Sequence, residues 1–247
     1  MEIKNKEEFV ERYYMGRMVA IAGGDLLSTR LLNIHAIKLS KKINPNVLFI
    51  GTASQDAKGY IEVITKEYTV LGCAIKSLCL VTDAYSDNEI DTMLSWADII
   101  YVGGGDTIFM MQTWKQFGLD KKLKKIYEQD LAVLTGISAG AICWFTCGHS
   151  DSEYFQDEEN WNYCWAEDML DIFHMAYCPH YNEEGRNTFD TMLRQKDIMG
   201  LAMENNTAFV YDNGKQYFMK STPNANAFFI QYKGDVMKKQ GVIFEEV

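Results

Sequence analysis

Residues 131–147, LAVLTGISAGAICWFTC, read as a buried β-strand that ends in a sharp turn and continues as an apolar helix. The turn, Gly136-Ile137-Ser138-Ala139-Gly140, has the G-x-S-x-G pattern of a nucleophile elbow. The glycines fit this interpretation because only a hydrogen side chain clears the adjoining strand and helix. Ser138 would lie at a helix N-terminus, where unpaired N–H groups favour negative charge. A tight turn without chemistry fits the same residues, so a nucleophilic serine requires partners elsewhere in the chain.

Before this turn, short β-branched runs alternate with segments of helical periodicity. Such alternation predicts a mainly parallel sheet with helices on both faces and right-handed crossovers, which is an α/β fold. The predicted strands are Met18–Ala22, Val47–Ala53, Ile75–Val81, Asp98–Val102 and Leu131–Thr135, and the predicted helices are Leu26–Lys42, Gly59–Leu71, Asp87–Trp96, Thr107–Phe117 and Asp120–Gln129.

After the turn the pattern changes. Ser150–Ala166 is acidic and aromatic and is predicted to be a surface loop, in which Tyr154–Trp165 would cover the site or a dimer contact. Met169–Cys178 returns to the interior, and Gly185–Gln195 is predicted to be helical. Near the C-terminus, Asp212-Asn213-Gly214 between two apolar runs is typical of a β-hairpin, and Phe228–Tyr232 adds a strand. With no repeat or linker, we expect residues 1–247 to form a single domain.

Composition excludes several classes of protein. The 247 residues carry 24 basic and 34 acidic side chains, a net charge of −10, which disfavours nucleic acid and anionic membranes as partners. Residues 1–17 are charged and helical in rhythm, and they lack the apolar core of a signal peptide. No later run reaches the roughly 18 apolar residues of a membrane span, so a cytoplasmic location is expected.

The six cysteines form no C-x-x-C pair, which argues against a disulfide framework or a zinc ribbon. Cys143 and Cys147 share a helical spacing with His149 close behind. Buried structural thiols are the ordinary interpretation of such residues, and no metal is expected there.

A serine nucleophile needs a base, and the chain has four histidines: His35, His149, His174 and His180. Catalytic groups of open α/β sheets gather at the carboxyl ends of strands. His180 directly follows an apolar run, and Pro179 before it fixes the backbone where that strand ends. His180 is therefore the best-placed base, although a histidine that merely caps the strand fits as well.

The base also needs an acid to orient it. Glu167, Asp168, Asp171 and Glu204 are the candidates. Glu204 ends the apolar run 200–203, where a half-buried carboxylate would require a partner such as a histidine N–H. The chain order Ser138, His180, Glu204 differs from the Ser–acid–His order of α/β-hydrolases, whereas Asp168 or Asp171 would restore that order.

Oxyanion donors are predicted from Gly103-Gly104-Gly105-Asp106-Thr107, which follows a strand and opens a helix. The backbone of Gly104 or Gly105 and the Ala139 N–H are the candidate donors. The alternative is a phosphate cradle shared with Gly23-Gly24-Asp25, but the aspartate beside each glycine pair would repel phosphate.

Four blocks, GGGDT at 103, GISAGA at 136, CPHY at 178 and GLAMENNTAFVYDNG at 200, stand in an order and spacing that resemble the peptidase E (aspartyl dipeptidase) family of serine peptidases. That family includes cyanophycinase-like members, and the resemblance extends from about Met18 to Tyr232. It implies an α/β/α sandwich similar to class I glutamine amidotransferase domains, with no cofactor. It also implies a Ser-His-Glu triad on Ser138, His180 and Glu204, with oxyanion donors on Gly104 or Gly105 and Ala139.

The chain departs from the family pattern in two places. Ile137 precedes the serine, where a small or hydroxylated residue is expected. Arg186, the candidate contact for a substrate carboxylate, follows Glu183 and Glu184, which would weaken anion binding. The sequence therefore predicts a serine peptidase that hydrolyses short peptides. A preference for aspartyl peptides is doubtful, and a homodimer is compatible with the sequence. An α/β-hydrolase-type esterase and a non-catalytic flavodoxin-like binding module are the alternatives.

Overall fold

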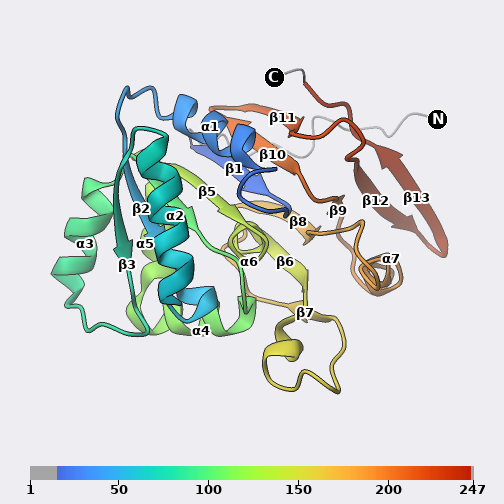
Figure 1. The fold of residues 1–247 in the computed structure, drawn as a ribbon. Coiled ribbons are helices and arrows are strands. Elements are labelled where there is room, and N and C mark those ends of the chain that lie inside the picture. The colour runs from blue at the N-terminus through green and yellow to red at the C-terminus, as the bar shows by residue number, and fades with distance from the viewer. Residues whose placement is uncertain (1–15, 246–247) are drawn as a thin grey trace.

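The computed structural model describes residues 16–245, which form two β-sheets and the helices that cover them (Figure 1). The first sheet has seven strands in the order β11-β10-β1-β5-β4-β2-β3, and β1, β5, β4, β2 and β3 run parallel. Its strands are β1 (Arg17–Ile21), β2 (Asn46–Ile50), β3 (Ala74–Leu78), β4 (Ile99–Val102), β5 (Val133–Ile137), β10 (Thr207–Asp212) and β11 (Lys215–Lys220). This sheet confirms the α/β class and places the end of β5 between β1 and β4.

Helices cover both faces of the first sheet. Side chains of α1 and α2 pack with one face, and those of α3, α4 and α5 pack with the other. The helices are α1 (Arg30–Leu39), α2 (Lys58–Val70), α3 (Asp87–Trp96), α4 (Thr107–Phe117) and α5 (Leu119–Glu128). Each lies within or close to its predicted range. The main difference is at α1, because the Asp25 side chain accepts from the N–H groups of Leu27 and Ser28 and holds a turn there.

The predicted hairpin is present. β10 and β11 pair antiparallel through the turn at Asp212–Lys215, and β10 also pairs antiparallel with β1. The C-terminal part of the chain therefore completes the first sheet beside its N-terminal strand.

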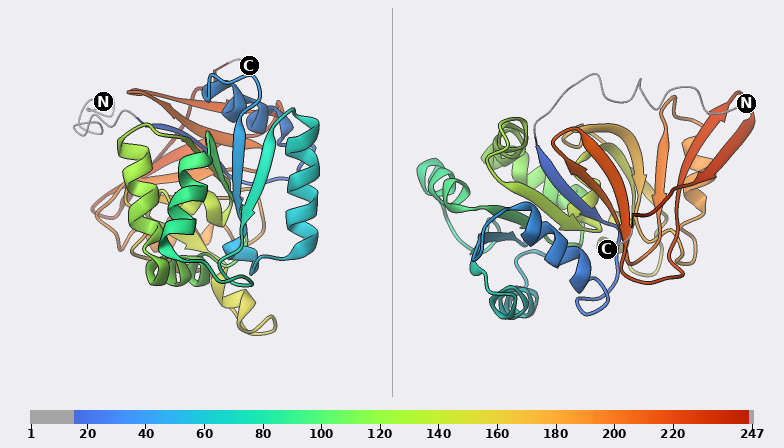
Figure 2. Two further views of the ribbon diagram at one scale, coloured as in Figure 1. Left: turned by 90° about the vertical axis from the view of Figure 1, so that its left-hand side faces the viewer. Right: turned by 90° about the horizontal axis from the view of Figure 1, so that it is seen from above.

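The second sheet was not predicted as a sheet, although the expected strand Phe228–Tyr232 is one of its members. It has six strands in the order β13-β12-β9-β8-β6-β7, and α7 (Thr188–Leu193) packs with β6, β8, β9 and β12. Figure 2 shows the chain passing from blue and green elements on one side to yellow-to-red strands on the other. The strands are β6 (Phe145–Ser150), β7 (Cys164–Ala166), β8 (Phe173–Cys178), β9 (Gly200–Met203), β12 (Ala227–Lys233) and β13 (Val236–Gly241).

The helix expected after Ser138 is wrong in length. It is a single turn, α6 (Ala139–Ile142), and the following aromatic and β-branched residues become β6. The Phe145 ring stacks on Tyr177 of β8 with 4.3 Å between ring centroids, and it also contacts Phe209 of β10. Pairing in a sheet and burial between the two sheets therefore override helix formation in this segment.

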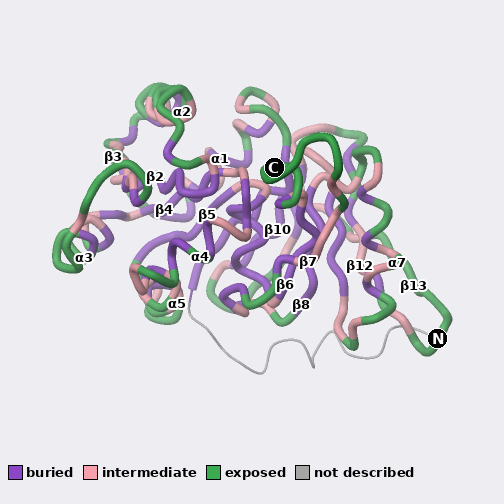
Figure 3. The backbone as a smooth tube through the Cα atoms, turned by 90° about the horizontal axis from the view of Figure 1, so that it is seen from below, coloured by how far each residue is buried: buried purple, intermediate pink, exposed green. Residues whose placement is uncertain are grey.

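The core lies between and within the sheets. Figure 3 shows the buried backbone running through the strands, with exposed segments at helix surfaces and loops. One hydrophobic cluster joins residues of both sheets.

The predicted loop at 150–166 contains a 3-10 turn, η2 (Ser152–Phe155), and the short β7. The helix predicted within residues 1–17 falls almost wholly outside the described residues, and no helix within 16–245 has the length and apolarity needed to cross a bilayer.

Candidate active site

The turn after β5 is a nucleophile elbow in its geometry. Ser138 has φ 57° and ψ −115°, a conformation that costs a non-glycine residue about 1–3 kcal/mol. A Cβ on Gly136 would lie 2.3 Å from the Gly140 carbonyl oxygen, and one on Gly140 would lie 2.2 Å from that of Val102. Both glycines of the motif are therefore required by backbone contacts, and the half-buried Ser138 projects at the carboxyl end of the sheet.

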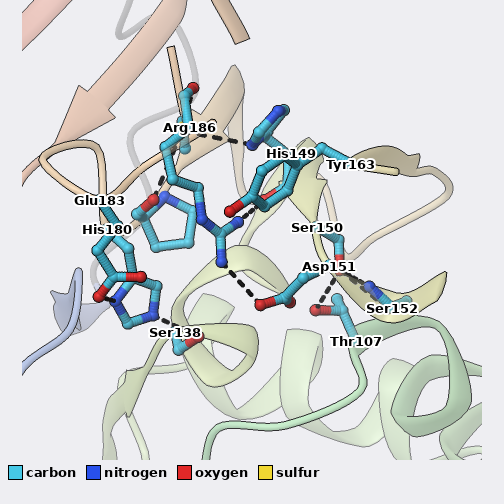
Figure 4. A network of polar contacts seen from close by, with 12 residues as sticks. Thr107, Ser138, His149, Ser150, Asp151, Ser152, Tyr163, His180, Glu183 and Arg186 are labelled. Carbon is cyan, nitrogen blue, oxygen red and sulfur yellow. Dashed lines mark hydrogen bonds and ion pairs between the residues drawn. The ribbon is translucent and has the colours of Figure 1, made fainter. Parts of the chain in front are cut away.

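His180 reaches this serine from the second sheet. It follows β8, also with a positive φ of 53°, and its Nε2 lies 2.9 Å from the Ser138 Oγ. The close approach depends on Gly23 at the end of β1, because a Cβ there would lie 2.3 Å from the imidazole Nδ1. Gly23 therefore makes room for the histidine. Figure 4 shows the His180 imidazole directed at Ser138.

Two acceptors lie at the other imidazole nitrogen. His180 Nδ1 is 2.7 Å from the Asn205 Oδ1 and 3.2 Å from the Glu183 Oε1. Since both are acceptors, the network assigns the proton to Nδ1 and leaves Nε2 to accept from the serine hydroxyl. The Asn205 amide also donates to Glu183 Oε1 at 2.8 Å, which joins the three side chains.

Glu183 supplies the negative charge at this end of the histidine. The hydrogen bond from His180 is the largest cause that lowers the pKa of Glu183, with the Asn205 amide adding to it and burial opposing it, to about 2. The ionised carboxylate therefore places a negative charge beside the Nδ1–H of His180.

The predicted acid, Glu204, does not reach the histidine. Its Oε2 accepts from the backbone N–H of Asn226 at 2.8 Å and from the Asn226 side chain at 3.2 Å. Glu204 comes directly after β9, and its side chain faces Asn226 next to β12. Asn205, in the turn that follows, has the side chain that faces His180, and Glu183 supplies the nearby carboxylate.

The predicted oxyanion loop lies against the serine. A Cβ on Gly104 would come within 3.3 Å of the Ser138 Cβ. The Gly104 N–H, however, donates to the Tyr60 hydroxyl at 3.3 Å. Within the described chain, the N–H groups of Gly105 and Ala139 donate to no other group. Asp106, next in the loop, caps α4 by accepting from Ile108 and Phe109.

Arg186 is connected to the site, but its guanidinium is already paired within the protein and is not available to bind a substrate carboxylate. Its side chain is 2% exposed, and its Nη2 is 2.9 Å from the Asp151 Oδ2. Its Nη1 donates to the His149 carbonyl at 3.1 Å, and its guanidinium lies 4.6 Å from the centre of the Tyr163 ring. Substrate contact by Arg186 would require this pairing to open.

The other candidates lie outside the serine–histidine pair. Asp171 accepts from Thr146 and contacts His174, whereas His35 contacts Tyr217. Burial lowers the pKa of His149 to about 3, so it is neutral, and its Nε2 contacts Thr188. Across residues 16–245, no cluster of histidine, cysteine and carboxylate side chains is placed to hold a metal ion.

Sequence reasoning missed Glu183 and Asn205. Glu183 lies three residues after the histidine in a turn, where its backbone N–H donates to the His180 carbonyl at 2.8 Å. Spacing of i, i+3 from the base was the available signal for Glu183. No comparable signal existed for Asn205, whose contact depends on how the turn after β9 lies against the loop after β8.

Comparison with known proteins places this geometry in a family. The model of peptidase family S51 matches residues 18–218. The chain belongs to this family, the peptidase E family. An uncharacterized peptidase of Bacillus subtilis, YgaJ, is 30% identical over 212 residues, which cover 82% of this chain and 86% of YgaJ. The chain is thus a peptidase, and therefore a hydrolase.

Solved structures of two other proteins have a similar fold. A candidate peptidase E protein from Listeria monocytogenes superimposes with a TM-score of 0.63 at 22% identity, covering 83% of this chain and 98% of that one. A peptidase from an acI-B1 Actinobacterium superimposes with a TM-score of 0.67 at 16% identity, covering 93% and 96%. The mixed α/β fold of this S51 chain is therefore the fold of peptidase E structures.

Proposed function

We propose that the chain is a serine peptidase that hydrolyses short peptides through an acyl-enzyme on Ser138. The observation that carries this proposal is the 2.9 Å contact between the His180 Nε2 and the Ser138 Oγ, on a strained turn at the carboxyl end of β5. Membership of the S51 family supports the same chemistry.

In this mechanism His180 takes the proton from the Ser138 hydroxyl as its oxygen attacks the peptide carbonyl carbon. The imidazolium then gives that proton to the leaving amine, which departs as the carbonyl re-forms in the acyl-enzyme. Water, deprotonated by His180, attacks the ester and releases the acid and the free serine. No redox step or additional reactant besides water is involved.

We assign the orienting role to Glu183 with Asn205 rather than to Glu204. Glu183 offers a charge that stabilises the imidazolium, and Asn205 offers the nearer acceptor for Nδ1–H. The geometry therefore favours a Ser138–His180–Glu183 triad with Asn205 as a positioning residue.

The oxyanion is assigned to the N–H groups of Gly105 and Ala139, with Gly104 held by the Tyr60 hydroxyl. Losing one such donor typically raises the barrier by about 3–4 kcal/mol. A short peptide is the proposed substrate because the family resemblance points to dipeptidases.

The proposal is tested by measuring hydrolysis of a panel of unblocked dipeptides and tripeptides by the wild type, Ser138→Ala and His180→Ala. We expect turnover by the wild type, and loss of at least about 10³-fold in each variant. Equal turnover by wild type and Ser138→Ala would show that another group performs the hydrolysis.

A further inference from the structure

The charge of Arg186 is already used within the protein. Its guanidinium pairs with Asp151, donates to the His149 carbonyl and lies over Tyr163, and its side chain is 2% exposed. Its Nε has no partner within the described chain, but that atom is buried and out of reach of solvent. A substrate carboxylate would have to displace Asp151 and reach a sealed group, which is unfavourable.

The accessible half of this ion pair is the carboxylate. The Asp151 side chain is 35% exposed, and its Oδ2 holds Arg186 at 2.9 Å. Its Oδ1 accepts no hydrogen bond from residues 16–245. Asp151 therefore presents one fixed carboxylate oxygen to a ligand without losing its contact with Arg186.

Asp151 is anchored on the side of the oxyanion loop. The Ser150 hydroxyl donates to the Thr107 Oγ1 at 3.2 Å, and the Ile108 N–H donates to the Ser152 Oγ at 3.2 Å. Thr107 and Ile108 begin α4 directly after the loop that contains Gly104, and Gly104 lies against Ser138. The residues on either side of Asp151 are thus bonded to the element that starts at the oxyanion loop.

Asp151 is also linked to the histidine side. The Arg186 backbone N–H donates to the Glu183 carbonyl at 3.2 Å, so the guanidinium that holds Asp151 belongs to the loop that carries His180. Figure 4 shows the Asp151 carboxylate between Thr107 and the Arg186 guanidinium. Ser138 and His180 belong to the same network of polar contacts. Asp151 is therefore connected to both loops of the proposed active site, through its neighbours and through Arg186, and we take this position as the rim of the site.

The charge at this rim suits a cation. Within this network of described residues, the charge of Arg186 is offset by Asp151, whereas Glu183 adds a second carboxylate, whose pKa is lowered to about 2 by its hydrogen bond from His180. The whole chain, these residues included, carries a net charge of −10, which attracts cations and repels anions.

We propose that Asp151 determines substrate specificity by binding a cationic group of the peptide on the acyl side of the scissile bond, either its α-ammonium or a basic side chain. This inference rests on the proposed function and makes the protein selective against acidic peptides. Arg186 is a positioning residue in this account, because it fixes the Asp151 carboxylate.

The test is peptide binding, measured by calorimetry in the folded Ser138→Ala variant, so that it does not depend on turnover. The ligands are Lys-Ala, Ala-Ala and Asp-Ala, and the N-acetylated forms of Lys-Ala and Ala-Ala. Removing the recognised cation should weaken binding about tenfold or more, as expected for a charge-assisted hydrogen bond. Weakening on acetylation identifies the α-ammonium as the ligand, and a preference for acetyl-Lys-Ala over acetyl-Ala-Ala identifies the basic side chain.

The cation preference is the ratio of the affinities for the peptides with and without the recognised cation. Adding Asp151→Asn to the Ser138→Ala variant should reduce this ratio to near unity. Adding Asp87→Asn instead, which removes the same charge from an exposed position in α3, should leave the ratio unchanged. If Asp151→Asn does not fold because Arg186 is left unpaired, Asp151→Leu with Arg186→Met removes both charges and is expected to give the same result. Tightest binding of Asp-Ala, no measurable binding of any cationic peptide, or a cation preference that survives these substitutions would overturn the inference. Failure of the proposed function would show itself separately, as absence of turnover by the wild type.

Discussion

At the scale of single residues, the site depends on how two acceptors share one imidazole N–H. Asn205 is nearer to Nδ1 than Glu183 is, at 2.7 Å against 3.2 Å, but only Glu183 carries charge. An amide oxygen fixes the tautomer, whereas a carboxylate also stabilises the imidazolium formed during attack. The two roles can therefore be separated by substitution.

Glu183→Gln is expected to lower kcat about 10²-fold, because the imidazolium loses its counter-charge while Asn205 still fixes the tautomer. Glu204→Gln is the matched control, since it changes the same group at the position that contacts Asn226. Steady-state kinetics on one dipeptide compares the two variants. A larger loss of kcat in Glu204→Gln than in Glu183→Gln would show that Glu204 orients the histidine.

The low pKa of Glu183 also predicts how stability depends on pH. The pKa lies near 2 in the folded chain against an ordinary value of 4.5, so the ionised carboxylate adds stability above about pH 4.5 that is lost as the pH falls toward 2. Glu183→Gln lacks this contribution. The free energy of unfolding, measured with urea, should therefore differ between wild type and variant at about pH 6 and converge toward about pH 3. A difference that grows on acidification would contradict the assignment.

Several residues of the site followed from the sequence because their chemistry is tied to local pattern. Ser138 is marked by its flanking glycines, and His180 by a strand end and a proline. Glu204 was misplaced because a run of apolar residues shows where a strand ends but not which way the next side chain points. The contact between Asn205 and His180 depends on how β8 and β9 pair, and neither segment alone shows this in its sequence.

At the scale of elements, the elbow is held by its glycines against the backbone of β4 and α6. Gly136→Ala would place a Cβ 2.3 Å from the Gly140 carbonyl oxygen, which cannot move without breaking the turn. This variant should lose at least about 2 kcal/mol of unfolding free energy, together with activity.

Gly59→Ala is the control for this effect, because a Cβ at Gly59 in α2 meets no atom within 4 Å. Alanine in a helix is favoured over glycine by about 0.5–1 kcal/mol. Thermal unfolding should therefore show a lower Tm for Gly136→Ala and an unchanged or higher Tm for Gly59→Ala. Equal Tm values would mean that the turn tolerates a side chain.

The first sheet was predictable because its strands and helices alternate with clear periods, and the Asp212-Asn213-Gly214 turn marks its hairpin. The second sheet was not, because its strands do not alternate with full helices as those of the first sheet do. The sequence of 143–150 predicts the continuation of a helix. The aromatic contacts of Phe145 with the two sheets, which explain why the segment forms β6 instead, are visible only in the structure.

At the scale of the whole molecule, aromatic rings join the two sheets. Phe209 of β10 contacts Phe145 and Phe173 of the second sheet at 6.0 and 4.9 Å between ring centroids, and its side chain is buried. If residues 1–247 form a single domain, Phe209→Ala should cost about 3–5 kcal/mol and leave one cooperative transition.

Far-ultraviolet circular dichroism and tryptophan fluorescence during urea unfolding check this expectation, with Phe155→Ala as a control because Phe155 is 47% exposed. Coincident transitions by the two probes support one domain. Two separate transitions would show that the sheets unfold independently.

The central claim is that Ser138 is a nucleophile activated by His180. Intact-mass analysis after treatment with a fluorophosphonate measures this most directly, because the reagent forms a covalent adduct with an activated serine and releases fluoride. We predict one adduct on the wild type, none on Ser138→Ala, and slower labelling of Glu183→Gln than of Glu204→Gln. Folded wild-type protein that stays unlabelled, or an adduct that persists in Ser138→Ala, would contradict the account.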